Sequence, residues 1–175
     1  MAPIHPDLLV ISASNGENLR LAERFAACGR SRGLTAQVLD LTEENLPLFT
    51  PRQLAASGIP AAIAALSERL AAAPRWVICA PEYNGSIPPV LTNAIAWLSV
   101  QGDDFRSLFN GRPIVIASHS GGGGFAVLTA LRILLAHLGS HVVGRQLVSN
   151  SSKQASDESI EDLIDRLRQL EPIQL

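Results

Sequence analysis

Short apolar runs alternate along the chain with longer segments in which apolar residues recur every three or four positions. The runs are typical of strands covered on both faces of a sheet, because such strands are apolar at nearly every position. The longer segments have the spacing of amphipathic helices. The predicted strands are residues 8–12, 35–40, 75–80, 113–118 and 141–147. The predicted helices are residues 18–31, 61–73, 89–99, 125–139 and 157–170.

Strand and helix alternate in this order, which is the pattern of parallel strands joined by right-handed crossovers with helices on both faces. We therefore predict an α/β fold: a flavodoxin-like three-layer sandwich with a five-stranded parallel sheet in the order 2-1-3-4-5. The chain has 175 residues, 47% of them hydrophobic, and shows neither a repeat nor a linker. We expect residues 1–175 to form a single domain.

The net charge of −2 comes without a basic stripe or an acidic block. This balance argues against a nucleic-acid or polybasic membrane surface. The first apolar run, residues 8–11, is too short for a signal-peptide core or a membrane span. Cys28 and Cys79 lie far apart in the sequence and form no C-x-x-C motif. We therefore interpret them as reduced, buried thiols of a cytoplasmic protein.

Two of the four histidines, His137 and His141, have a spacing that would place both on one face of a continuous helix. Gly139 falls between them and is expected to end the helix. No carboxylate or cysteine lies nearby to complete a set of ligands. The sequence therefore predicts no metal site.

The loops that follow the first, third and fourth strands are the places to look for a ligand. In doubly wound sheets, ligands bind beyond the carboxyl ends of the strands, where the strand order reverses. These loops read SASNGEN (12–18), PEYNGSIP (81–88) and SHSGGGGF (118–125), and all are rich in small, polar or glycine residues. We expect them to form one site.

The first loop leads from a strand into a helix N-terminus, where free backbone N–H groups and the helix dipole favour an anion. Ser12, Ser14, Asn15 and Asn18 add side-chain donors, and Arg20 could reach the same anion. The alternative is that Asn18 simply caps the helix.

The third loop contains consecutive glycines at 121–124, which let backbone approach a ligand closely. Ser120 in Ser-His-Ser-Gly-Gly comes near the nucleophile-elbow motif, but a hydrolase needs an acid and then a histidine further along. No acidic residue lies between Ser120 and His141, and no histidine follows Asp157. A dinucleotide fingerprint starting at Gly121 lacks the acidic residue about 20 positions on. What remains is a loop whose amides bind the polar edge of a heterocycle.

The middle loop contains Tyr83, the single tyrosine of the chain. A flat ring could contact its face or rim, while the amides near Asn84 and Gly85 meet the polar edge of that ring. The alternative is a surface aromatic that packs on its own loop. Glu82 is interpreted as a solvated or partner-paired carboxylate and not as a catalytic acid.

The segment Pro-Glu-Tyr-Asn-Gly-Ser-Ile-Pro at 81–88, followed by Leu91, Asn-Ala-Ile at 93–95 and Trp-Leu-Ser at 97–99, resembles the NAD(P)H-dependent FMN reductases. This family includes bacterial quinone and chromate reductases. Segments 46–49, 111–113 and 118–124 are similar too. The resemblance implies bound FMN, NADPH or NADH as the electron donor, and a dimer or a dimer of dimers.

The same resemblance implies that the three loops bind FMN and that no protein side chain is catalytic, because the flavin does the chemistry. The expected FMN-binding residues are Ser12, Ser14, Asn15, Asn18, Pro81, Glu82, Tyr83, Asn84, Gly85, Ser86, Ser118, His119, Ser120, Gly121 and Gly122. In the family the first loop commonly carries an arginine, which here falls on Asn15 or is missing. FMN is therefore expected to bind more weakly unless Arg20 substitutes.

By the same resemblance, hydride passes from the nicotinamide to the flavin, and electrons then pass to a quinone, free flavin or similar small acceptor in a ping-pong mechanism. The alternative is a flavin-binding electron carrier or sensor, against which the near-neutral charge weighs. Helix 125–139 is apolar almost all round, which indicates a homodimer or homotetramer through helices 89–99, with Trp97, and 125–139. The connection 41–60 is expected to cover a neighbouring site. Alternatively, the helix is covered within one chain.

Overall fold

A parallel β-sheet in the order β2-β1-β3-β4-β5 forms the middle of the computed structural model, which describes residues 5–173. The predicted strand order is confirmed. The strands are β1 (Leu8–Ser12), β2 (Ala36–Asp40), β3 (Arg75–Cys79), β4 (Pro113–His119), β5 (His141–Val142) and β6 (Leu147–Ser149). The α-helices are α1 (Glu17–Ser31), α2 (Pro51–Ser57), α3 (Ala61–Ala72), α4 (Pro89–Leu98), α5 (Phe125–His137) and α6 (Asp157–Arg168). Two short 3₁₀ helices are η1 (Leu41–Glu44) and η2 (Phe105–Leu108).

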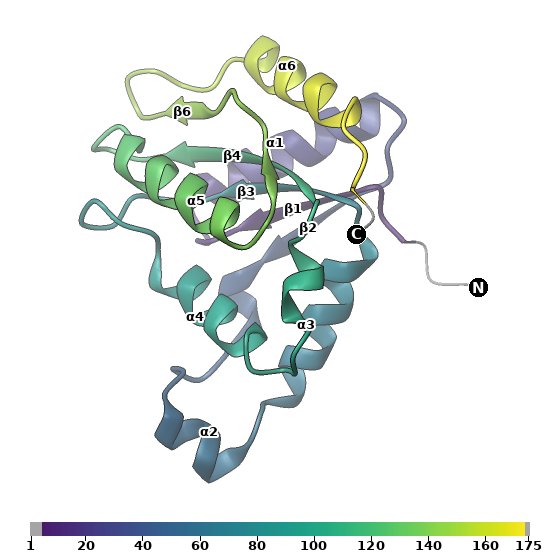
Figure 1. Ribbon diagram of the computed structural model, residues 1–175. Helices are drawn as coiled ribbons and strands as arrows, with labels where there is room; N and C mark the ends of the chain where they lie inside the picture. Colours follow the sequence, from purple (N-terminus) through teal and green to yellow (C-terminus); the bar gives the residue numbers. More distant parts are fainter. Residues whose placement is uncertain (1–4, 174–175) are drawn as a thin grey trace.

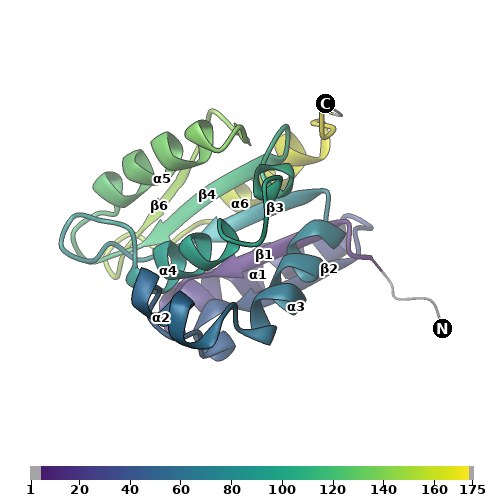
Figure 2. The same ribbon diagram turned by 60° about the horizontal axis from the view of Figure 1, so that its bottom comes forward.

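Helices cover both faces of the sheet, with α1 and α6 on one face and α3, α4 and α5 on the other (Figures 1 and 2). Successive residues of a strand point to opposite faces. In β1, Leu9 and Ile11 pack into the core under α3, α4 and α5, whereas Leu8 and Val10 pack into the core under α1 and α6. All positions of β1 are therefore buried, which explains its continuous apolar run.

The predicted fifth strand, 141–147, is wrong in its extent, because the structure has two short strands there. β5 pairs with the start of β4, and β6 pairs with its end. Arg132 on α5 donates to the carbonyl oxygens of Val143 (3.1 Å) and Gly144 (3.4 Å) and to the side chain of Gln146 (3.0 Å). These contacts tie the segment between the two strands to α5 and interrupt the ladder, so the sheet has six strands.

Helix α2 lies in the connection 41–60, for which the sequence analysis predicted no helix. Thr50 caps it by accepting a hydrogen bond from the Gln53 N–H (2.9 Å), Pro51 occupies its first turn, and Gly58 ends it with φ 68°. Threonine-proline before a helix and glycine after it are ordinary boundary signals. No residue of α2 is buried, and the helix lies apart from the sheet at the bottom of Figure 1.

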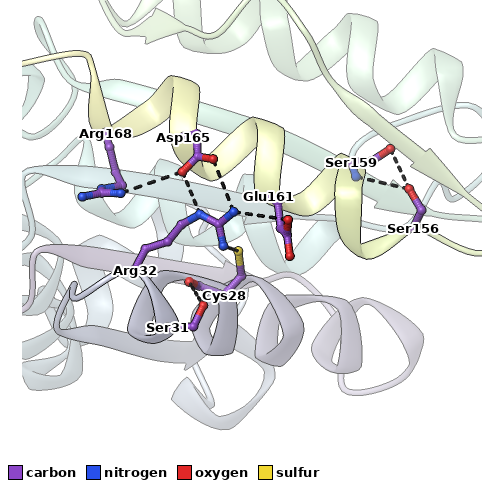
Figure 3. A network of polar contacts seen from close by, with 8 residues as sticks. All are labelled: Cys28, Ser31, Arg32, Ser156, Ser159, Glu161, Asp165 and Arg168. Atoms are coloured by element: carbon purple, nitrogen blue, oxygen red, sulfur yellow. Dashed lines mark hydrogen bonds and ion pairs between the residues drawn. The ribbon is translucent and has the colours of Figure 1, made fainter.

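A network of ion pairs joins α1 to α6 (Figure 3). The Arg32 guanidinium contacts Asp165 (2.7 Å) and Glu161 (3.3 Å) and donates to the Cys28 sulfur (3.2 Å). Burial raises the pKa of the Cys28 thiol and also that of the fully buried Cys79 thiol. Both cysteines are free. Because their pKa values are raised, both thiols stay protonated at neutral pH.

Arg112 joins three elements at the amino end of the sheet without a carboxylate partner among the described residues. Its guanidinium donates to the carbonyl oxygens of Leu108 (2.5 Å) and Ala73 and lies 4.5 Å from the centre of the Trp76 ring. Burial lowers the pKa of Arg112 to about 10. The cation therefore links η2 and the end of α3 to β3.

Replacing Arg112 by methionine keeps the apolar stem but removes the donors to two carbonyl groups and the cation over Trp76. We expect the free energy of unfolding to fall by about 2–3 kcal/mol. Urea denaturation measures this, with the exposed Arg52→Met on α2 as the matched control. Equal denaturation midpoints for the two variants would contradict the role of Arg112.

Candidate functional site

The three loops singled out in the sequence lie side by side at the carboxyl edge of the sheet. Backbone hydrogen bonds continue the ladder past the strand ends and join the loops: Ala13 N–H donates to Cys79 (2.9 Å) and Ala80 N–H to Ala117 (3.0 Å). The Ser120 N–H likewise donates to the carbonyl of Ser149 on β6 (3.0 Å). The edge lies at the left of Figure 1. The prediction that these loops meet is confirmed.

Asn18 ties the first loop to the third. Its side-chain N–H donates to the His119 carbonyl (2.9 Å), and its oxygen accepts the His119 N–H (2.9 Å). The residue is 2% exposed. It does not cap α1, because the helix begins one residue earlier and its N-cap is Gly16. The alternative interpretation of Asn18 as an N-cap is therefore wrong, and its amide holds two loops together.

The N-terminus of α1 has no side-chain cap, and Asn15, Gly16 and Glu17 are exposed. A Cβ added at Gly16 would meet nothing within 4 Å, so its backbone is open to solvent. The buried Ser12 hydroxyl donates to the Ser14 carbonyl (2.6 Å) and shapes the turn before the helix. This turn therefore offers an open N-terminus to an anion.

Arg20, expected to reach the same anion, forms an ion pair with Glu17 on the exposed surface of α1. It also lines a small pocket of about 170 Å³ beside the first loop. The other residues that line this pocket are Glu17, Leu21, Arg24, His119, Ser149 and Gln154. The predicted contact between Arg20 and the anion stays a prediction.

The middle loop is a tight hairpin closed by two backbone hydrogen bonds between Tyr83 and Ser86 (3.2 and 3.0 Å). Asn84 and Gly85 at its tip have positive φ angles of 51° and 71°. A two-residue turn with both central residues left-handed is the type I′ turn, for which Asn-Gly is the preferred pair. The conformation of the turn thus explains why asparagine and glycine occupy positions 84 and 85. Tyr83 at the base of the hairpin is 50% exposed, so its ring is free to contact a ligand.

The third loop is built on two buried serines. The Ser118 and Ser120 hydroxyl oxygens lie 2.9 Å apart, and Ser120 accepts the Glu82 N–H (2.6 Å). His119 contacts Ser149 through Nδ1 (3.1 Å). Ser120 is buried in this network, and its hydroxyl contacts Ser118 and Glu82 rather than a histidine. The structure therefore does not support Ser120 as the nucleophile of a hydrolase.

Glu82 binds the N-terminus of α5, a contact that the sequence analysis missed. Its Oε2 atom accepts the N–H groups of Ala126 (3.0 Å) and Val127 (3.3 Å). Helix α5 starts from Gly124, which has no side chain to cap it. The glycine before α5 indicated that the helix needs a cap from elsewhere in the chain. Nothing in the sequence spacing indicated that residue 82 provides this cap. The partner of this carboxylate therefore lies within the same chain.

Compared with α4 and α5, which also begin at this edge, α1 has the more open start, because its first turn has neither a proline nor a bound carboxylate. The first turn of α5 is bound by Glu82. Helix α4 begins after Pro88 with Pro89, and proline has no backbone N–H. Added Cβ atoms at Gly85 and Gly121 would meet nothing within 4 Å, so backbone there is open too. The edge thus combines an uncapped helix start, an exposed aromatic ring and open backbone.

A hollow of about 650 Å³ lies at the opposite, amino edge. His5, Gln37, Glu68 and Arg69 are among the residues that line it. Between residues 5 and 173, no three His, Cys, Asp or Glu side chains are grouped as a metal site would need. In the same range, no helix is long and apolar enough to cross a membrane.

A family model described as NADPH-dependent FMN reductase matches residues 6–154. The chain belongs to this family. It is 36% identical over 103 residues to a quinone reductase of Escherichia coli (strain K12), covering 58% of this chain and 53% of that protein. It is 30% identical over 141 residues to an NAD(P)H-dependent FMN reductase of Pseudomonas aeruginosa, covering 79% of this chain and 73% of that one. The match to the quinone reductase thus spans about half of that relative's length.

Solved structures agree on the fold of this FMN reductase family member. The flavoenzyme NAD(P)H:(acceptor) oxidoreductase FerB of Paracoccus denitrificans superposes with a TM-score of 0.71 at 18% identity, covering 94% of this chain and 98% of that one. A flavodoxin from the domain Archaea superposes with a TM-score of 0.62 at 12% identity, covering 93% and 96%. The predicted flavodoxin-like fold and the predicted family of FMN-dependent oxidoreductases are confirmed.

Gly124 gives the third loop its shape, and substitution there tests this. Its φ is +68°, and an added Cβ would lie 2.6 Å from the Ser118 hydroxyl oxygen. We expect Gly124→Ala to lower the free energy of unfolding by about 2 kcal/mol. Gly121→Ala is the control, because its added Cβ meets open space; we expect it to change stability by less than about 0.5 kcal/mol. Similar denaturation curves for both would contradict this account.

Proposed function

We propose that this protein is an NAD(P)H-dependent FMN reductase of small electron acceptors such as quinones or free flavin, with a single FMN-binding domain. The observation that carries the proposal is the uncapped N-terminus of α1 at the same edge as the exposed Tyr83 ring and the open glycine backbone. Bound FMN accepts a hydride from the nicotinamide and gives up electrons to the acceptor. The protein supplies placement and electrostatics.

The three loops have separate tasks in this proposal. Backbone N–H groups at the start of α1, with Ser14 and Asn15, hold the phosphate, because this start has no side-chain cap, whereas α4 starts with a proline and α5 is bound by Glu82. Tyr83 and the hairpin tip support the ring. The exposed backbone of Gly121 and Gly122 faces its polar edge. Donors placed there would stabilise negative charge that develops on reduction.

A flavin-binding electron carrier or sensor is the alternative. A carrier that docks on redox proteins is expected to have a strongly charged face, and the net charge here is −2. We therefore favour direct oxidation of NADH or NADPH. A ping-pong order follows if the nicotinamide must leave before the acceptor reaches the same ring face. A cytoplasmic location is part of the proposal and is motivated by the free thiols of Cys28 and Cys79.

The function is tested by loading the purified protein with FMN and adding NADPH or NADH without oxygen. We expect the flavin absorbance to bleach and to return when a quinone is added, and double-reciprocal plots at several quinone concentrations to be parallel. Heat-denatured protein with the same FMN controls for reduction of free flavin. Bound flavin that does not bleach would favour the carrier, and failure to bind FMN would refute both functions.

We also propose the dimer, through α5 and α4. Along α5, Phe125 (71%) and Ile133 (68%) are strongly exposed, while Val127, Leu128 and Leu131 on its inner side are fully buried. An apolar outer stripe on a helix whose inner stripe fills the core favours a second subunit. The predicted participation of Trp97 is wrong. This ring is fully buried, packs edge-on against Phe49 and donates to the Pro47 carbonyl (2.7 Å).

The connection 41–60 belongs to the same proposal, as a cover over the neighbouring subunit's site. No residue of α2 is buried, and the Leu48 side chain before it is 74% exposed. Such a segment gains burial when a partner lies against it.

Ile133→Glu tests the dimer, because it places a charge in the middle of the exposed stripe. We expect wild-type protein to sediment as at least twice 18.6 kDa and the variant to sediment as one chain. The control is Leu170→Glu, at an exposed position just after α6, which should leave the wild-type assembly intact. Sedimentation of the wild-type protein as a single chain would refute the dimer.

A further inference from the structure

Glu82 contacts the third loop and α5 through both its backbone and its side chain. Its N–H donates to the Ser120 hydroxyl (2.6 Å), which lies 2.9 Å from the Ser118 hydroxyl. Its carboxylate accepts the second and third N–H groups of α5, those of Ala126 and Val127. A residue of the middle loop therefore fixes both ends of the glycine segment 121–124.

The backbone of the glycine segment passes close to this carboxylate. A Cβ added at Gly122 would lie 3.2 Å from Glu82 Oε1, so the backbone passes directly against the carboxylate. Glycines have no side chains to restrict their backbone, and ordering four of them costs conformational entropy. Contacts from outside the segment have to supply that order. Glu82 supplies them from one side and Ser118 from the other.

Glu82 also occupies one of the two helix starts at this edge that could attract an external anion, those of α1 and α5. The positive end of the α5 dipole attracts an anion just as that of α1 does. In this chain an internal carboxylate already occupies it, whereas α1 has no side-chain cap. Of these two helix starts, that of α1 is therefore the more open to a phosphate group.

We propose that Glu82 is a positioning residue of the FMN site. Its carboxylate holds the start of α5, and with it the glycine segment 121–124, against the hairpin 81–86 before FMN binds. The residue takes no part in proton or hydride transfer. The inference rests on the proposed FMN-binding function and goes beyond it by assigning the preorganisation of the ring site to one side chain.

Three substitutions of Glu82 distinguish the effect of its side-chain length from the effect of its charge. Because the same oxygen accepts both N–H groups, the carbonyl oxygen of glutamine can replace it in Glu82→Gln without the charge. Glu82→Asp keeps the charge on a shorter side chain that does not reach α5, and Glu82→Ala loses both. Ser156→Ala is the matched control: Ser156 caps α6, on the opposite face of the sheet from α5, by accepting the Ser159 N–H (3.2 Å; Figure 3).

FMN affinity is measured by quenching of flavin fluorescence on titration with each apoprotein. We expect Glu82→Ala and Glu82→Asp to bind FMN about tenfold more weakly, and Glu82→Gln to stay within about threefold of wild type. Ser156→Ala should lower thermal stability but leave FMN affinity unchanged. Wild-type affinity in Glu82→Ala, or equal weakening in the glutamine and alanine variants, would overturn the proposal.

Hydrogen exchange of the apoproteins tests the same idea without FMN. We expect amides of residues 121–127 to exchange about tenfold faster in Glu82→Asp and Glu82→Ala, and at the wild-type rate in Glu82→Gln and Ser156→Ala. Uniform exchange across all variants would overturn the positioning role. If wild-type protein bound no FMN, the proposed function would fail, and the exchange rates would still decide whether Glu82 orders the segment.

Discussion

Backbone N–H groups at helix starts need partners, and this requirement organises the carboxyl edge of the sheet. In a parallel sheet, the helices that follow the strands begin at one edge, so their unpaired amides gather there. The starts of α4, α5 and α1 differ in how these amides are treated. Proline removes the donor at the start of α4, a carboxylate from the preceding loop occupies the start of α5, and the start of α1 is left without a cap. Because of this difference, the two ends of a bound ligand would meet different surroundings along the edge.

The same edge shows how residues that look alike in the sequence divide between structure and binding. Asn18 and Asn84 were both predicted to bind the ligand. The first holds the His119 backbone with both ends of its amide, and the second provides the left-handed backbone of a hairpin. Ser118 and Ser120 are likewise buried in the scaffold. The groups left open are backbone amides, the Tyr83 ring and the exposed Asn15 side chain. A site of this kind binds through the shape of its main chain, and its side chains mostly hold that shape.

The parts of the fold that depend on local pattern could be predicted from the sequence. β1, β3 and β4 are apolar on both faces, and α6 has a clean amphipathic period with an acidic start and a basic end. The prediction was wrong where a distant contact decides. Arg132 ties down the segment after β5 and splits a run that looks continuous, and Trp97 turns inward to meet Pro47 and Phe49. Helix α2 is a different case, because its capping residues were visible and its lack of an apolar stripe hid it. Of the site, the three loops were predictable, whereas the bond from Glu82 to α5 spans 44 positions and leaves no periodic trace.

Both ends of the described chain lie at the amino edge of the sheet. Asp7 bonds to Thr35 just before the first strands, and the Ile173 N–H donates to the Gly111 carbonyl (3.1 Å) just before β4. The chain therefore enters and leaves the sheet on the side away from the three loops (Figure 1). A tether to an electrode or a fused carrier, joined at either terminus, would leave the carboxyl edge facing solution and open to electron donors and acceptors.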